Sequence, residues 1–283
     1  MQLRTERFKG ASGVGLVADV GGEPGQPPVV LLHGGGQTRY SWGQATADLV
    51  CAGHHVISLD LRGHGESDWA VNADYSVNAF AADLEAVVAT LDRPPALIGA
   101  SLGGATALVA VGEHDGVLAE SLVLVDVVPR MAQTGVDHIR DFMRANLDGF
   151  ADVGEAADAV ARYLPGRPRP SSNDGLMKNL RLRSNGRLYW HWDPAFQTGP
   201  TRIDPEEMTT RMEAAARNVV VPTLLVRGRQ SDVVTEDGAR RLLELIPHAQ
   251  FVDVEGAGHM VAGDKNDVFN ESIESFLRTV ERA

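Results

Sequence analysis

The most constraining feature of the sequence is a series of short apolar runs that alternate with helix-like patterns. PVVLLH at 28–33 and SLVLVD at 121–126 are almost wholly apolar, which is typical of parallel strands buried on both faces. Between such runs, residues 76–91 place apolar side chains on one face of a 3.6-residue period, with Ser76 as the expected N-cap. Alternating strands and helices predict an α/β fold, a doubly wound and mostly parallel sheet with right-handed crossovers.

We expect eight strands in this sheet. Two alternating runs, 3–8 and 14–20, predict an antiparallel pair joined by a Gly-rich turn. The six apolar runs that predict the remaining strands lie at 28–33, 55–60, 96–99, 121–126, 223–228 and 251–256. A second helical pattern, from 268 to 280, closes the chain.

The alternation stops between residues 128 and 220. This segment contains helix-like pieces at 137–147, 153–163 and 205–217 and an aromatic cluster, YWHWDPAF, at 189–196, but no strand runs. It is too long for a loop. We therefore predict a core made of 1–127 and 221–283, with 128–220 as a helical insertion.

Composition and charge exclude several classes of protein. The net charge of −12 argues against nucleic-acid binding, which needs a basic surface. The single cysteine, Cys51, forbids an intrachain disulfide and suits a reducing cytoplasm. The histidines are scattered, without the spacing of a zinc site, so we expect neither metal nor cofactor. The sequence has no long apolar stretch and no apolar leader, so we expect a cytoplasmic protein that does not bind membranes.

Candidate reactive residues follow the predicted strands, where sites gather in open α/β sheets. The most specific pattern is Gly99-x-Ser101-x-Gly103, between a predicted strand and a predicted helix. This is the pattern of a nucleophile elbow, in which small residues allow a sharp turn that exposes the serine hydroxyl. The alternative, a serine that only caps the helix, does not explain the glycines on both sides.

A serine nucleophile needs a general base and a carboxylate that orients the base. His259, in the glycine-flanked loop EGAGH after the last predicted strand, is the best placed histidine. Two aspartates end strands at the same edge of the sheet, Asp126 and Asp232. We favour Asp232, because the short interval after its strand suits a side chain that reaches His259, and Asp126 stays open as the alternative.

The oxyanion formed on attack needs preorganised N–H donors. We expect one from the amide of Leu102, at the start of the helix after Ser101. The second is expected from the glycine run at 34–36, most directly from Gly35, since glycine allows a ligand to approach the backbone closely.

The motifs together resemble the α/β-hydrolase superfamily. HGGG at 33–36, DLRGHGES at 60–67, GASLGG at 99–104, SD at 231–232 and GAGH at 256–259 occur in the order of that family. The resemblance covers 1–127 and 221–283, and it implies that 128–220 is a cap. Within the family the chain resembles capped bacterial serine hydrolases of the esterase and cofactor-free haloperoxidase branch. Epoxide hydrolases and dehalogenases of this fold use an aspartate nucleophile, which Ser101 does not match.

The resemblance implies acyl transfer to water, with a small carboxylic ester or lactone of apolar or aromatic character as substrate. Two alternatives are a C–C bond hydrolase acting on diketo acids from aromatic-ring breakdown, which needs a basic site for the substrate carboxylate, and a non-catalytic ligand-binding protein. The physiological substrate and the oligomeric state are left open. Candidate substrate-binding residues, each of which could instead pack the cap onto the body, are Trp42, Met143, Trp190, His191, Trp192 and Met260.

Overall fold

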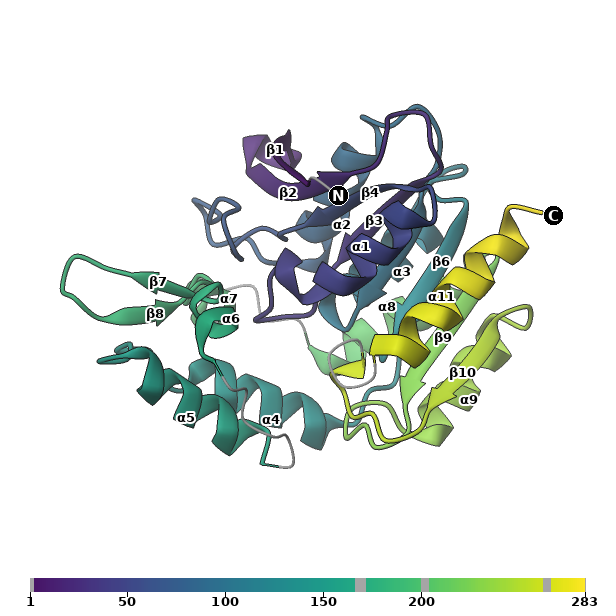
Figure 1. Ribbon diagram of the computed structural model, residues 1–283. Coiled ribbons are helices and arrows are strands. Elements are labelled where there is room, and N and C mark those ends of the chain that lie inside the picture. The colour runs from purple at the N-terminus through teal and green to yellow at the C-terminus, as the bar shows by residue number, and fades with distance from the viewer. Residues whose placement is uncertain (1–2, 166–171, 200–203, 262–265, 283) are drawn as a thin grey trace.

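Eight strands form one sheet in the order β1-β2-β4-β3-β5-β6-β9-β10 (Figure 1). This computed structural model describes residues 3–165, 172–199, 204–261 and 266–282. The pairs β1–β2 and β2–β4 are antiparallel and all other neighbours are parallel. The predicted fold class is therefore confirmed. The strands are β1 (Arg4–Lys9), β2 (Gly15–Gly21), β3 (Pro28–Leu32), β4 (His55–Leu59), β5 (Ala96–Ala100), β6 (Ser121–Val125), β9 (Thr223–Gly228) and β10 (Gln250–Val254).

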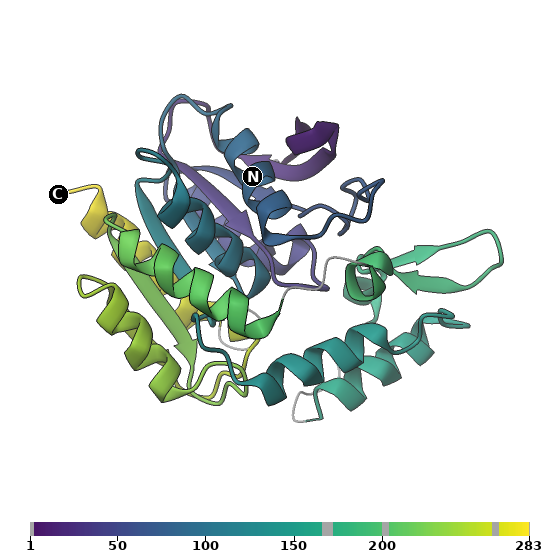
Figure 2. The same cartoon turned by 180° about the vertical axis from the view of Figure 1, so that it is seen from behind.

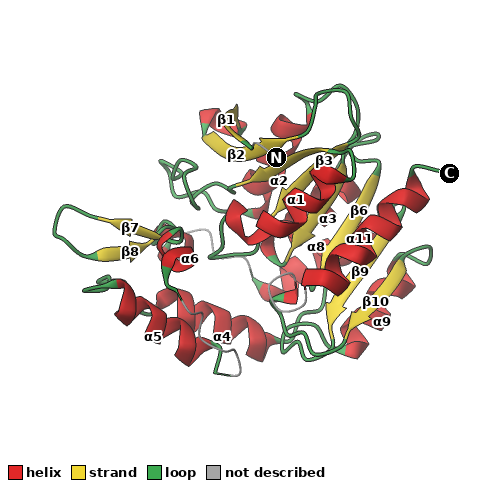
Figure 3. Cartoon of the chain, in the orientation of Figure 1, coloured by secondary structure: helices red, strands yellow, loops and turns green. Residues whose placement is uncertain are grey.

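Helices cover both faces of the sheet, as Figures 1 and 2 show from opposite sides. One face carries α2 (Val77–Val88), α3 (Leu102–Glu113), α8 (Pro205–Asn218) and α9 (Glu236–Leu245), whose apolar side chains share one buried cluster. The other face carries α1 (Gly43–Cys51) and α11 (Asn266–Val280), which share a second cluster. Two short 3-10 helices are η1 (Ala11–Gly13) and η2 (Arg39–Trp42). Figure 3 shows this layering by element type.

Helix α2 begins where the sequence predicts. The Ser76 hydroxyl accepts a hydrogen bond of 3.2 Å from the amide of Ala79, satisfying one of the free N–H groups of the first turn. Phe80, Leu84 and Val87 are buried on the side that faces the sheet. The apolar residues that recur with a helical period in the sequence are thus the residues that are buried in α2.

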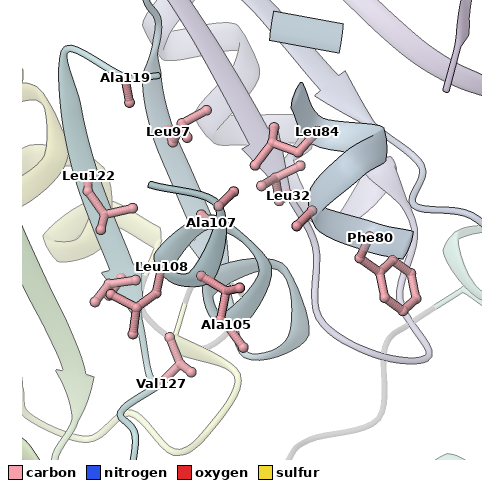
Figure 4. Close-up of a cluster of buried hydrophobic side chains, with 14 of the residues drawn as sticks. Leu32, Phe80, Leu84, Leu97, Ala105, Ala107, Leu108, Ala119, Leu122 and Val127 are labelled. Atoms are coloured by element: carbon pink, nitrogen blue, oxygen red, sulfur yellow. The ribbon is translucent and has the colours of Figure 1, made fainter. Parts of the chain in front are cut away.

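The larger core lies between β3, β5 and β6 and the helices α2 and α3 (Figure 4). Small residues in α3 allow this helix to approach the sheet closely, while leucines from the strands fill the space between them. The labelled side chains are Leu32, Phe80, Leu84, Leu97, Ala105, Ala107, Leu108, Ala119, Leu122 and Val127.

The segment after β6 leaves the sheet and forms a separate layer, which we call the cap (residues 133–199). Figure 2 shows it beyond one end of the sheet. It has a buried aromatic cluster of its own, which includes Phe150, Trp190 and Trp192. Its elements are α4 (Gln133–Arg144), α5 (Val153–Tyr163), α6 (Asp174–Met177), β7 (Leu180–Leu182), β8 (Leu188–Trp190) and α7 (Ala195–Thr198).

The prediction that the insertion contains no strands is wrong. β7 and β8 form an antiparallel hairpin in which Leu180 faces Trp190. The hairpin turns at Asn185-Gly186, where Gly186 has a φ of +77°, and Asn-Gly is a strong hairpin signal. Strands of three residues are too short to be recognised from an apolar run. The Asn185-Gly186 dipeptide is the sequence feature that indicates this hairpin.

The last helix of the predicted insertion lies on the body. Helix α8 packs against α3 of the body rather than against the cap. A Cβ on Gly112 of α3 would lie 2.2 Å from the carbonyl oxygen of Ala215 in α8, so the two backbones are almost in contact. Arg211 and Glu113 join the same helices by an ion pair of 2.6 Å. Helix α8 therefore packs with the body, although it lies within the segment 128–220, and the boundary at 220 stays a prediction.

No helix among the described residues is long and apolar enough to cross a membrane.

The crossing of α3 over β3 gives a stability prediction. A Cβ on Gly103 would lie 2.3 Å from the backbone oxygen of Leu32, an atom that no side-chain rotation can move. We expect Gly103→Ala to lower the free energy of unfolding by about 3 kcal/mol in urea titrations. Gly43→Ala is the control, because nothing lies within 4 Å of its Cβ position, and we expect a change below about 0.5 kcal/mol or a slight gain. Equal effects of the two variants would contradict this packing.

Candidate active site

Ser101 lies in the sharp turn between β5 and α3. Its backbone has a φ of +48° and a ψ of −113°, a strained conformation for a residue with a side chain. The turn requires glycine on both sides: a Cβ on Gly99 would lie 2.5 Å from the oxygen of Gly103. The Ser101 amide donates to the oxygen of Val125 at the end of β6, at 3.1 Å. The strand that carries Ser101 is thereby fixed to the strand that precedes Asp126.

His259 is paired with Asp126. The distance from His259 Nδ1 to Asp126 Oδ2 is 2.7 Å. Asp126 is fully buried and directly follows β6, with a φ of +47°. Its Oδ1 accepts from the Gly228 amide at 3.0 Å, and its Oδ2 also accepts from the Ser231 hydroxyl at 2.5 Å. These donors compensate the cost of burying a carboxylate next to an imidazole.

The expectation that Asp232 would lie against His259 is therefore wrong. The Asp232 carboxylate is 57% exposed and lies 3.5 Å from Nδ1 of His138 on the cap helix α4. The reason is the turn after β9, in which the neighbouring side chain, Ser231, points inward to Asp126 and Asp232 points outward. Asp126, directly at the end of the central strand β6, has no such turn between its strand and the site.

The glycine loop after β3 is anchored by a buried histidine. His33 Nε2 accepts from the Leu61 amide at 3.0 Å, so the ring proton is on Nδ1, which donates to the Gly34 oxygen at 2.8 Å. The Gln37 amide donates to the same oxygen at 3.1 Å. In a trans peptide the next N–H, that of Gly35, points the opposite way from this carbonyl.

Two backbone amides at this place have no acceptor among the described residues, those of Gly35 and Leu102. Leu102 is the first residue of α3, where helix N–H groups lack partners within the helix. The Cβ position of Gly34 lies 3.4 Å from the Cβ of Ser101, so the glycine loop lies over the serine turn. The glycine loop and the start of α3, which contain the two predicted oxyanion donors, thus meet at Ser101.

Three histidine rings, His33, His64 and His191, form a buried row of mutually tilted rings between the body and the cap, which we call the stack. The ring centroids are 5.2 Å apart for His33 and His64 and 5.9 Å apart for His64 and His191. Burial lowers the pKa of His33 to about 4 and that of His64 to about 3, and it lowers the pKa of His191 well below its usual value. The stack is therefore neutral at physiological pH.

The six residues predicted to bind substrate lie in different surroundings. His191, Trp192 and Met143 lie against Gly36 of the glycine loop: a Cβ there would meet the Met143 and Trp192 side chains at 3.2 and 3.5 Å. Trp190 stacks behind Trp192 in the cap core, with centroids 5.0 Å apart.

Trp42 and Met260 line a cavity together with His259. Trp42 stacks on Phe269 in the core under α11, and Met260 accepts a hydrogen bond from Gln37. Both line a cavity of about 370 Å³ beside His259. The structure thus brings three of the six residues to the glycine loop and places Trp190 and Trp42 in packing positions.

Sequence reasoning missed one residue of this site. Ser231 holds the Asp126 carboxylate, and its oxygen also accepts from the amides of Val233 and Val234 at 3.1 and 3.0 Å. The Ser-Asp pair at 231–232 marks the correct turn, but the functional contact comes from the serine. Within the described part of the chain, no group of three His, Cys, Asp or Glu residues is arranged to hold a metal.

Comparisons with known proteins identify the family of the chain. The α/β hydrolase fold family model matches residues 27–265, and the chain belongs to that family. It is 29% identical to esterase Rv0045c of Mycobacterium tuberculosis, over 89% of this chain and 83% of the relative. It is 30% identical to the non-heme chloroperoxidase CPO-A1 of Kitasatospora aureofaciens, over 88% and 92%.

Among solved structures, an E-2-(acetamidomethylene)succinate hydrolase superposes with a TM-score of 0.85 at 23% identity, over 98% of this chain and 100% of the other. This likeness supports the fold. The sequence relatives support a general hydrolase or esterase role on it.

The buried histidine stack gives a pH prediction. Each ring is neutral when folded and takes up a proton with its ordinary pKa near 6.5 when unfolded, so the unfolded state binds more protons as the pH falls below 6.5. Stability is therefore lost from about pH 6.5 downward, by about 1.4 kcal/mol per histidine between pH 7.5 and 5.5. We expect His64→Gln to reduce this loss by about one histidine's share in urea titrations at the two pH values.

The control is Phe196→Leu, which alters the ring packed edge-on against His64 at 4.9 Å without removing a titrating group. It should lower stability equally at both pH values. An unchanged pH dependence in His64→Gln would contradict the neutral stack.

Proposed function

We propose that the protein is a serine hydrolase that cleaves small carboxylic esters through an acyl-enzyme intermediate. Ser101 is the nucleophile, His259 the general base and Asp126 the carboxylate that orients it. The observation that carries this proposal is the 2.7 Å contact between His259 Nδ1 and the buried Asp126. It supplies what a serine needs to act at neutral pH, a base of fixed tautomer.

The tautomer follows from the contact. An ionised Asp126 only accepts hydrogen bonds, so the His259 proton is on Nδ1 and the lone pair is on Nε2. Nε2 takes the Ser101 hydroxyl proton as Oγ bonds to the ester carbonyl carbon. The resulting imidazolium gives that proton to the leaving alkoxide as the carbon–oxygen bond breaks. Water then attacks the acyl-enzyme by the same proton transfers, releasing the acid and restoring Ser101.

The amides of Gly35 and Leu102 are the proposed donors to the carbonyl oxygen as its charge develops. Both are backbone groups of anchored segments, so they need little reorganisation during the reaction. Such preorganised donors each contribute on the order of 10²–10³ in rate.

The surroundings of the glycine loop favour an apolar acyl group. The Cβ position of Gly35 lies 3.7 Å from the ring of Phe196 and 3.9 Å from Leu102. Ile139 and Val136 of α4 are half-buried and pack against the larger core of the body. Apolar walls with a few convergent polar groups are typical of sites for small neutral ligands. The similarity to the esterase Rv0045c supports the same class of reaction.

The arginines of the segment 128–220 bear on the alternative of a C–C bond hydrolase. Among the described residues, Arg130 pairs with Glu213 and Arg211 with Glu113. Arg187 donates to backbone oxygens of the cap, and Arg181 and Arg183 lie over the Trp69 ring. These five arginines contact acidic, backbone or aromatic partners, and none of the contacts involves Ser101, Gly35 or Leu102, which favours a neutral ester over a diketo acid.

The test is hydrolysis of a p-nitrophenyl ester series from acetate to octanoate. We expect turnover with a preference for one chain length, and Ser101→Ala should reduce kcat by at least about 10⁴-fold. A fluorophosphonate should add one covalent mass to the wild type and none to Ser101→Ala. Ser12→Ala is the control, since this serine lies in η1 next to β1. A folded wild type that neither hydrolyses these esters nor takes up the probe would overturn the proposal.

A further inference from the structure

We infer that the cap residue His191 positions the oxyanion donor Gly35 by fixing the carbonyl of Gly36. This inference rests on the proposed function and adds a positioning residue to it. It makes docking of the cap a condition for a formed oxyanion hole.

One neutral tautomer of His191 serves two backbone groups of the body. The Gly65 amide donates to His191 Nδ1 at 2.7 Å, so the ring proton is on Nε2. Nε2 lies 3.3 Å from the Gly36 oxygen and donates to it. His191 therefore joins the loop after β4 to the loop after β3, through a ring that is only 1% exposed.

The glycine loop needs such an anchor from outside. Residues 34–36 have no side chains to restrict them, and glycine loses more conformational freedom on ordering than any other residue. The Gly34 carbonyl is fixed from the body by His33 and the Gln37 amide. The Gly36 carbonyl is fixed from the cap by His191. The Gly35 N–H shares a rigid peptide unit with the Gly34 carbonyl, and the Gly36 carbonyl holds the other side of Gly35 two peptide units further along, so the position of this N–H depends on both anchors.

His191 is itself fixed by the cap. Its amide donates to the Asn179 oxygen at 3.1 Å, and its ring meets Trp192 edge-on with centroids 5.3 Å apart. Two residues further on, the Asp193 amide donates to the Gly63 oxygen at 2.8 Å and the Asp193 carboxylate accepts from the Tyr75 hydroxyl at 2.5 Å. The ring can reach Gly36 only while this part of the cap is seated on the body.

Packing around Gly36 supports the same coupling. Its φ of +75° favours glycine, and the Met143 and Trp192 side chains lie 3.2 and 3.5 Å from its Cβ position. A departing cap would remove these side chains together with the His191 hydrogen bond. The Gly36 carbonyl would then lose its partner, and the Gly35 N–H would lose one of its two constraints.

Two amide substitutions separate the contacts of the ring. In His191→Gln the side-chain amide reaches the position of Nε2 and can donate to Gly36. In His191→Asn it reaches only the position of Nδ1 and can accept from Gly65. His191→Phe keeps a ring and removes both contacts. Phe150→Leu is the control for cap stability, because Phe150 is fully buried in the cap cluster.

The measurement is kcat and KM for p-nitrophenyl acetate, whose acyl group is too small to depend on the cap for binding. We expect kcat to fall about tenfold in His191→Asn and His191→Phe with KM nearly unchanged, because a displaced donor weakens transition-state binding alone. His191→Gln should recover most of the loss. Phe150→Leu should lower the melting temperature and leave kcat within about twofold.

Equal kcat in wild type, Asn and Gln variants would overturn the inference, as would a loss in Gln as large as in Asn. If His191→Phe fails to fold, the comparison of kcat between His191→Asn and His191→Gln tests the inference on its own. A wild type that is inactive and is not labelled at Ser101 by a fluorophosphonate reports failure of the proposed function instead. A labelled, active wild type with unchanged variants reports failure of this inference only.

Discussion

The candidate site depends on one buried carboxylate, that of Asp126. It receives hydrogen bonds from the backbone of Gly228, the hydroxyl of Ser231 and the imidazole of His259. These donors come from three separate segments, β9, the turn after it and the loop after β10. The single buried carboxylate fixes the positions of these segments relative to one another. Because an uncompensated charge would be costly there, the three segments can hardly rearrange independently. The geometry of His259 is thus a property of the whole sheet edge.

The second dependence is between the body and the cap. The neutral stack of His33, His64 and His191 fills the junction without charge, while hydrogen bonds from its members fix both carbonyls that flank Gly35. The cap therefore contributes apolar walls and also orders backbone that lies outside it. In the proposed site, substrate binding by the cap and the orientation of the Gly35 N–H therefore depend on the same contact between cap and body.

Much of the fold and of the candidate site could be predicted from the sequence, because these features depend on local residue patterns. The apolar runs predict the sheet, the Gly99-x-Ser101-x-Gly103 pattern predicts the turn, and the glycine run predicts the free amide of Gly35. The sequence could not decide which aspartate pairs with His259, since Asp126 and Asp232 both follow predicted strands at the same edge of the sheet. The difference lies in the turn after β9, which directs Ser231 inward and Asp232 outward, and a turn of four residues leaves no periodic signal. The place of α8 on α3 is likewise a tertiary choice, made where Gly112 permits close approach.

The central claim is that Asp126 orients His259 for Ser101. The most direct measurement is kcat/KM for a p-nitrophenyl ester in Asp126→Asn and Asp232→Asn, the two carboxylates that the sequence alone leaves in competition. The account predicts a loss of about 10³–10⁴-fold in Asp126→Asn, because an amide there favours the wrong tautomer of His259. It predicts a change within about twofold in Asp232→Asn, whose side chain is exposed. A large loss in Asp232→Asn with an active Asp126→Asn would contradict it.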